Sequence, residues 1–357
     1  MLEAEGLCKR YGNFDAVKDL SFKIETGGIY GFLGPNGAGK STTMNMITGY
    51  LAPTSGRVLI DGIDITKEPK KAKEKLGYLP EVPPLYPDLT VKEYLGFVSE
   101  LKRVPAAGRK SAVKEIMERT GLDQVGGKLI RNLSKGYKQR TGIAAAIIGY
   151  PDLIILDEPT SGLDPAQIIE IRELIRSLKE NHTVILSSHI LQEISALCDH
   201  IMVISHGRLM ANDTPENIAA SMNTENRLSL LIKGEEGGLR ETFASASFIR
   251  SFAIEEEEGL FRAVLISDAG EDIREKVFDL IKNSGFKIFD MRSKHMSLED
   301  VYMKLTSDDY EEVKGEAAAD EKKEAGTDPG EGSGGDIREG AGSDSSEDSG
   351  SEGGDME

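Results

Sequence analysis

The segment "GPNGAGKST" (34–42, the phosphate segment) has residue types and spacing that suit the binding of nucleotide phosphates. It follows the apolar run "GIYGFLG" and precedes "STTMNMITGYL", which has the pattern of a helix. Its three glycines would let backbone N–H groups surround the phosphates, and the start of the helix adds a favourable dipole. Lys40 would reach the β- and γ-phosphates, and the Ser41 hydroxyl would bind Mg²⁺. A glycine-rich turn that matches by chance is the alternative, and both flanking elements argue against it.

Two carboxylates end the apolar run "LIILDEP" (153–159). Asp157 and Glu158 would lie at the carboxyl edge of a parallel sheet, where ligands bind in open α/β folds. Asp157 can hold Mg²⁺ through water, and Glu158 can orient or deprotonate an attacking water. Carboxylates at strand ends also cap helices, so this motif indicates a functional site mainly because it occurs together with the phosphate segment.

His189 ends the apolar run "TVILSS" and is expected at the same edge of the same sheet. A lone histidine is more often a structural residue than a functional one. Beside a γ-phosphate, however, an imidazole could hydrogen-bond the phosphate or the attacking water. Glu158 and His189 are therefore the candidate catalytic residues.

The segment "LSKGYKQR" (133–140) contains a second glycine-bearing helix start, far along the chain from the first. A helix N-terminus with free N–H donors and a serine hydroxyl suits a γ-phosphate. The plainer interpretation is that Ser134 caps the helix, and the two roles are compatible. The segment raises the question of what a second such site binds.

Hydrophobic patterns predict the elements that position these residues. Short alternating strands are expected over 1–33 and 57–65, and helical spacing over 90–125. Continuous apolar strands are then expected at 152–159 and 183–189, on either side of a helix at 165–180. Strands of this kind alternating with helices indicate a parallel sheet covered on both faces.

A second unit begins near residue 223, where the order becomes strand, helix, strand, strand, helix, strand. That order predicts a small α+β ferredoxin-like domain, and the last short helix, "SLEDVYMKLT" (297–306), is expected to close it. The predicted divisions are a cassette at 1–222, an accessory domain at 223–307 and a tail at 308–357.

The tail dominates the charge of the chain. From Asp308 to Glu357 there are 18 acidic and 4 basic residues, so most of the formal net charge of −18 lies there. This Gly-, Ser- and acid-rich segment predicts disorder, because it cannot bury enough apolar surface to fold. A solubilising role is the plain interpretation, and a regulatory or partner-binding role is the alternative. The rest of the chain is not basic, so no nucleic acid partner is expected.

Cysteine usage and hydropathy bear on the compartment. Cys8 and Cys198 are far apart in unrelated contexts, which favours a reducing compartment over a disulfide framework. The N-terminus has no pattern of an export signal, and no apolar run reaches the length needed to span a bilayer. Any work at a membrane would need a separate spanning chain.

Together these residues resemble one family, the nucleotide-binding subunits of ATP-binding cassette (ABC) transporters. The resemblance covers roughly residues 1–220 and rests on ordered motifs, namely 34–41, "GYLPE" at 77–81, "LSKGYKQR" at 133–140, "LDEP" at 156–159, "SGLD" at 161–164 and His189. It implies a P-loop NTPase cassette of the α/β class, with a parallel sheet core, an N-terminal antiparallel β subdomain and a helical subdomain.

In this family two cassettes pair head to tail, and the segment equivalent to 133–140, the signature segment, covers the ATP of the partner. The resemblance thus implies that Ser134, Lys135 and Gly136 bind the partner's ATP and that Asp164 lies in a loop at the dimer interface. The implied nucleotide-binding residues are Tyr11, Gly34, Pro35, Asn36, Gly37, Ala38, Gly39, Lys40, Ser41 and Thr42, with Ser41, Asp157 and Glu81 at the metal. Tyr11 matches an aromatic that stacks on adenine, with core packing as the alternative.

The sequence departs from the family pattern at two places. Glu81 stands where the family usually has Gln, and a carboxylate can approach Mg²⁺ but cannot donate a hydrogen bond. In the signature segment, Lys135 replaces the usual second Gly and Tyr137 the usual Gln, which leaves Ser134 and Gly136 intact. Cassettes of bacterial exporters often carry similar variants, so export is favoured over import.

The sequence therefore predicts an ATP-binding and ATP-hydrolysing motor subunit of an ABC transporter. Two copies, identical or paralogous, would close around two ATP and Mg²⁺ and act on a separate transmembrane permease through the surface around Glu81. The permease would hold the protein at the cytoplasmic face of the membrane. A soluble ABC-type ATPase acting in translation or DNA maintenance is one alternative, but such proteins usually carry two cassettes or a long coiled-coil insertion. An unrelated P-loop kinase or GTPase would have no use for the signature segment.

Overall fold

The computed structural model describes residues 1–221, 225–257, 259–268, 272–294 and 297–307. The predicted disordered tail at 308–357 lies outside the described residues.

A six-stranded sheet with the strand order β10-β9-β3-β8-β7-β6 forms the centre of the cassette. Its strands are β3 (Ile29–Leu33), β6 (Leu76–Leu79), β7 (Leu153–Asp157), β8 (Thr183–Ser188), β9 (His200–Ser205) and β10 (Arg208–Asp213). All neighbours pair in parallel except β9 with β10. Every residue of β3, β7 and β8 is buried, which is why these strands have continuous apolar runs instead of alternating, with polar residues in β7 and β8 only near the strand ends. The predicted parallel sheet is confirmed.

An antiparallel sheet with the order β2-β1-β4-β5 covers one face of the central sheet. Its strands are β1 (Leu2–Tyr11), β2 (Phe14–Ile24), β4 (Ser55–Ile60) and β5 (Ile63–Asp64), and the helices α1 (Lys40–Ile47) and α2 (Pro69–Glu74) accompany it. Leu7 and Val17 from this sheet share one hydrophobic cluster with Met44 of α1 and Ile155 of β7. This layer is the predicted N-terminal β subdomain.

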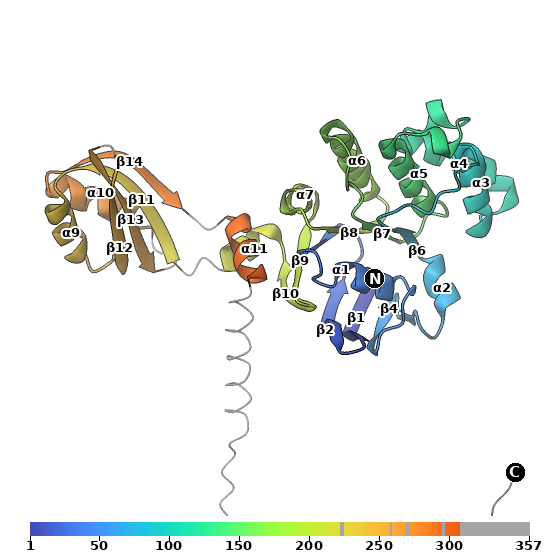
Figure 1. The fold of residues 1–357 in the computed structure, drawn as a ribbon, viewed down its shortest axis with the longest axis horizontal. Helices are drawn as coiled ribbons and strands as arrows, with labels where there is room; N and C mark the ends of the chain where they lie inside the picture. The colour runs from blue at the N-terminus through green and yellow to red at the C-terminus, as the bar shows by residue number, and fades with distance from the viewer. Residues whose placement is uncertain (222–224, 258, 269–271, 295–296, 308–357) are drawn as a thin grey trace, which may run out of the picture. The chain divides into compact units, whose positions relative to one another are not determined.

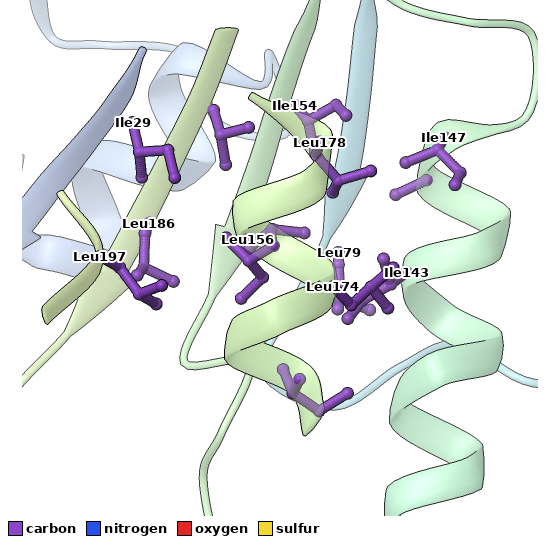
Figure 2. Close-up of a cluster of buried hydrophobic side chains, with 14 of the residues drawn as sticks. Ile29, Leu79, Ile143, Ile147, Ile154, Leu156, Leu174, Leu178, Leu186 and Leu197 are labelled. Carbon is purple, nitrogen blue, oxygen red and sulfur yellow. The ribbon is translucent and has the colours of Figure 1, made fainter. Parts of the chain in front are cut away.

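Helices cover the other face of the central sheet. They are α3 (Val91–Leu101), α4 (Ala106–Thr120), α5 (Lys135–Ile147), α6 (Pro165–Leu178), α7 (Leu191–Leu197) and α8 (Pro215–Ser221), with the 3-10 turns η1 (Asp123–Val125) and η2 (Ile130–Asn132). Figure 2 shows Ile143 of α5 and Leu174 of α6 in the same cluster as Leu156 of β7. Because Leu156 points to this cluster and its neighbour Ile155 to the opposite one, β7 alternates between two apolar layers.

Local capping explains where several helices begin. Thr90 accepts a hydrogen bond from the Glu93 amide, and the Glu93 carboxylate accepts one from the Thr90 amide, which together form a capping box at the start of α3. α3, α4 and α5 contact one another beside β6 and form the helical subdomain (Figure 1). Among the described helices, none has both the length and the apolar character needed to cross a bilayer.

The accessory domain has its own sheet and its own hydrophobic core. Its elements are β11 (Glu225–Lys233), α9 (Glu236–Ala244), β12 (Ser251–Glu257), β13 (Leu260–Asp268), α10 (Arg274–Asn283) and β14 (Lys287–Lys294). The strand order β12-β13-β11-β14, antiparallel throughout, is that of a ferredoxin-like fold. The boundary proposed near residue 222 stays a prediction, since 222–224 lie outside the described residues.

The last helix, α11 (Leu298–Thr306), belongs to the cassette. It contacts α8 and β9, and its Val301 and Leu305 are buried in the same cluster as Ile218. The expectation that this helix closes the accessory domain is therefore wrong. The apolar stripe of α11 packs on the cassette. A hydrophobic pattern in the sequence does not indicate which surface such a stripe will cover.

Replacing Leu305, which is 2% exposed, with alanine is expected to destabilise the cassette by about 2–5 kcal/mol, because a buried methyl-rich side chain is lost and a cavity remains. Met303 lies on the same helix but is 67% exposed, so Met303→Ala is the matched control. Urea unfolding followed by circular dichroism measures both. Equal midpoints for the two variants would contradict the packing of α11 on the cassette.

Candidate ATP-binding and hydrolysis site

The phosphate segment joins β3 to α1 through a turn that requires glycine. Gly39 has a φ of 102°, and a Cβ at this position would lie 2.6 Å from the backbone oxygen of Ala16. In the described structure no side chain caps α1, whereas Thr90 caps α3, Ser134 caps α5 and Asp164 caps α6. The first amides of α1 are thus left for an anionic ligand.

Lys40 is held against the turn that it follows. Its side chain is 6% exposed, and its ammonium donates hydrogen bonds to the backbone oxygens of Gly34 (2.8 Å) and Pro35 (3.2 Å). Burial lowers the pKa of this ammonium, while the negative charges of Glu158 and Asp157 act in the opposite direction. A phosphate could replace these two carbonyl acceptors as the partner of a cation that is already in place.

Glu158 and His189 are in direct contact. The His189 Nδ1 atom lies 3.0 Å from each carboxylate oxygen of Glu158, whose side chain is 11% exposed. Glu158 has a φ of 47°, in the left-handed region, which costs a residue of this type roughly 1–3 kcal/mol. Its amide donates to the Ser187 oxygen at 3.0 Å, which fixes the strained backbone against the end of β8. The result is a carboxylate base with an imidazole beside it.

Asp157 is buried without a partner for one of its oxygens. The residue is 4% exposed, and among the described residues its Oδ1 atom meets no hydrogen-bond donor. Burial raises the pKa of this carboxyl group and the charges of Glu158 and Glu81 raise it further, while the Ser187 hydroxyl acts in the opposite direction. An orphaned carboxylate oxygen at the carboxyl edge of the sheet fits Mg²⁺, bound directly or through water. The donor set with Ser41 and Glu81 consists of oxygen atoms alone, which this cation prefers.

A cavity of about 400 Å³ gathers most of the predicted residues. It is lined by Tyr11, Phe14, Ala16, Asn36, Gly37, Gly39, Lys40, Ser41, Thr42, Glu81, Glu158 and His189. Tyr11 is 49% exposed at this cavity, and the ammonium of Lys9 lies 5.4 Å from the centroid of its ring. Tyr11 is therefore not a core residue. Phe14 and Ala16 were not anticipated, because no spacing rule links them to the phosphate segment.

The predicted signature residues lie elsewhere. Among the described residues that line this cavity, none comes from 134–136. The Ser134 Oγ accepts a hydrogen bond from the Tyr137 amide at 3.4 Å, and the Lys135 ammonium lies over Gly162. Gly136 is buried against α6, where a Cβ would come within 2.6 Å of the Gln167 Oε1 atom.

Asp164, the predicted interface residue, caps α6 through a 3.0 Å hydrogen bond from the Gln167 amide. Because Gln167 also lies against Gly136, the 161–164 turn and the signature segment adjoin each other in one chain. No residue of 134–136 or 161–164 is among the described residues that line the nucleotide cavity, but Lys135 and Ser161 line a neighbouring cavity together with Glu81, which lines both.

Sequence reasoning missed one buried acid near the site. Glu193 is 4% exposed and accepts hydrogen bonds from Thr160 and Ser188, two residues that flank the candidate catalytic pair. The only signal in the sequence is an acidic residue four positions after His189, in "SHILQE", and helix surfaces carry such residues routinely.

Comparisons with known proteins identify the family of the chain. A family model described as "ABC transporter" matches residues 17–161. The bacitracin transport ATP-binding protein BcrA of Bacillus licheniformis is 35% identical over 308 residues, which cover 85% of this chain and 97% of that protein. The linearmycin resistance ATP-binding protein LnrL of Bacillus subtilis (strain 168) is 38% identical over 254 residues, covering 71% and 80%.

A solved dimeric ATP-binding cassette, described as a post-hydrolysis state with bound ADP and Pi, has a TM-score of 0.55 and 26% identity. The match covers 60% of this chain and 98% of that structure. The fold and the site together define an ATP-hydrolysing cassette protein. The chain belongs to the ABC transporter family, as the ATP-binding motor subunit of a transporter.

Lys40→Ala should reduce ATP turnover by about 100-fold or more, since a preorganised cation at a reacting phosphate is lost. Lys70→Ala, which removes an exposed lysine outside the nucleotide cavity, should leave turnover unchanged. Phosphate release from the purified full chain measures both variants, with circular dichroism as the test of folding. Turnover near the wild-type rate in folded Lys40→Ala would overturn the assignment of the phosphate segment.

Proposed function

We propose that two cassettes close around two ATP molecules and reopen when the ATP is hydrolysed. Each ATP lies between the phosphate segment of one cassette and Ser134, Lys135 and Gly136 of the other. The separation of the signature segment from the nucleotide cavity of its own chain supports this arrangement. The uncapped start of α1 supplies donors on one side of the nucleotide, and the exposed Ser134 supplies them on the other.

The contact between Glu158 and His189 beside Lys40 is the observation that carries the chemistry. Glu158 takes a proton from the attacking water, and the imidazole 3.0 Å away orients that water or the γ-phosphate. Lys40 and the amides of α1 stabilise the charge that develops on the phosphate oxygens. Mg²⁺, when bound, would neutralise phosphate charge, and Ser41, Asp157 and Glu81 are the residues that would hold it.

The surface after Glu81 is the proposed contact with a transmembrane permease. Glu81 lines the nucleotide cavity and also a second cavity of about 470 Å³, together with Val82 and Lys138. Val82 is 79% exposed and Tyr86 is 53% exposed, so both side chains are accessible to a partner. A residue shared by the two cavities can report the state of the nucleotide to a partner. The permease would hold the motor at the cytoplasmic face of the membrane.

Export is the proposed direction of transport. Two relatives that match over most of their length are described as serving bacitracin transport and linearmycin resistance. An ATP-driven transporter can confer resistance to a compound by removing it from the cell or its membrane. The substitutions Lys135 and Tyr137 in the signature segment favour the same direction by resemblance.

Glu158→Gln should bind ATP, hydrolyse it about 100-fold more slowly or worse, and accumulate as an ATP-bound dimer. The amide keeps the shape of the side chain but cannot accept the proton of the water. Size-exclusion chromatography with and without ATP measures the dimer. The control is Glu180→Gln, which changes an exposed acid beyond α6. This variant should hydrolyse ATP normally and show the same balance of monomer and dimer as the wild type. A Glu158→Gln protein that binds ATP yet stays monomeric would remove the support for the shared site.

A further inference from the structure

Glu193 is a buried acid that the proposed chemistry does not use. It lies in the first turn of α7 and is 4% exposed. An unpaired carboxylate at such a depth would be strongly destabilising, so its partners indicate why it is there.

A single oxygen of Glu193 accepts two hydrogen bonds. The Oε2 atom receives the hydroxyl of Thr160 at 2.7 Å and the hydroxyl of Ser188 at 2.9 Å. Both donors are buried, with Thr160 at 5% and Ser188 at 0% exposure. The Ser188 Oγ also accepts the Ile190 amide at 3.1 Å, which orients its proton toward Glu193.

The negative charge of Glu193 is balanced nearby. The Arg172 Nη2 atom of α6 lies 3.9 Å from the second carboxylate oxygen. The position in the first turn of α7 adds the favourable field of the helix N-terminus. The Oε2 atom is thereby the acceptor of two hydroxyl protons at once.

The two hydroxyl donors are placed beside the two candidate catalytic residues. Thr160 follows Glu158 by two residues, and Ser188 immediately precedes His189. Glu158 holds a left-handed backbone conformation that persists only when its surroundings fix it. One carboxylate therefore joins the strained turn after β7 to the end of β8.

We propose that Glu193 is a positioning residue for ATP hydrolysis, which keeps the Glu158 carboxylate and the His189 imidazole in contact. The inference rests on the proposed roles of Glu158 and His189. Without the carboxylate, the 158–161 turn loses its side-chain tie to β8 and keeps only the backbone hydrogen bond from Glu158 to Ser187. The strained Glu158 backbone can then shift, which moves its carboxylate away from the imidazole. The phosphate segment is anchored by other residues, so ATP binding should be largely preserved.

The test measures kcat and KM of the full chain for variants at this position. Glu193→Ala should lower kcat by about 10- to 100-fold, the usual cost of losing an orienting partner of a catalytic group, with little change in KM. Glu193→Gln should recover most of the rate, since its amide oxygen can still accept both hydroxyl protons. Glu173→Ala, an exposed acid on α6, is the matched control and should behave as the wild type.

A double-mutant cycle with His189→Ala separates positioning from a general loss of stability. If Glu193 acts through the catalytic pair, Glu193→Ala should slow His189→Ala little further. The inference would be overturned if the reductions in kcat of the two single variants multiplied in the double variant. A rise in KM without a fall in kcat would also overturn it. Should Glu193→Ala fail to fold, Thr160→Val and Ser188→Ala each remove one donor and should show the same non-additivity. Full activity of Glu158→Gln and His189→Ala would instead refute the proposed function itself.

Discussion

Parallel pairing of β3, β8 and β7 is the constraint on which the site depends. In register, Leu33 pairs with Ser188, and Asp157 pairs with Ser187. The carboxyl ends of the three strands therefore meet at one edge, and the residues that follow them meet as well. The phosphate segment, Glu158 and His189 come from distant parts of the sequence and line one cavity for this reason. The strands stay in place because apolar layers bury both faces of the sheet.

Groups held in unfavourable states concentrate at that edge. Lys40 and Asp157 are buried, the Glu158 backbone is left-handed, and one Asp157 oxygen has no donor among the described residues. Each of these states costs free energy in the absence of nucleotide, and each suits a phosphate, a metal ion or an attacking water. Helix caps and the hydrogen bonds between strands in the surrounding structure offset the free energy that these groups cost.

Much of this arrangement could be predicted from the sequence, and the exceptions have physical reasons. The phosphate segment and the run 153–159 were identifiable because each combines a motif with the correct flanking elements. The βαββαβ order of the accessory domain followed from alternation and turns. The docking of α11 was not predictable, because an apolar stripe in the sequence does not indicate which surface it will cover. Glu193 was missed because its burial and partners arise from tertiary contacts alone.

The central claim is that each ATP is gripped by two chains, and complementation between inactive variants tests it most directly. Lys40→Ala damages the phosphate segment, and Ser134→Arg damages the signature segment. A mixed dimer of the two would contain one site with both defects and one site with neither. The account predicts that each variant alone is inactive and that mixing them restores ATP hydrolysis. A mixture that forms dimers yet remains as inactive as its components would show that a single chain encloses the nucleotide.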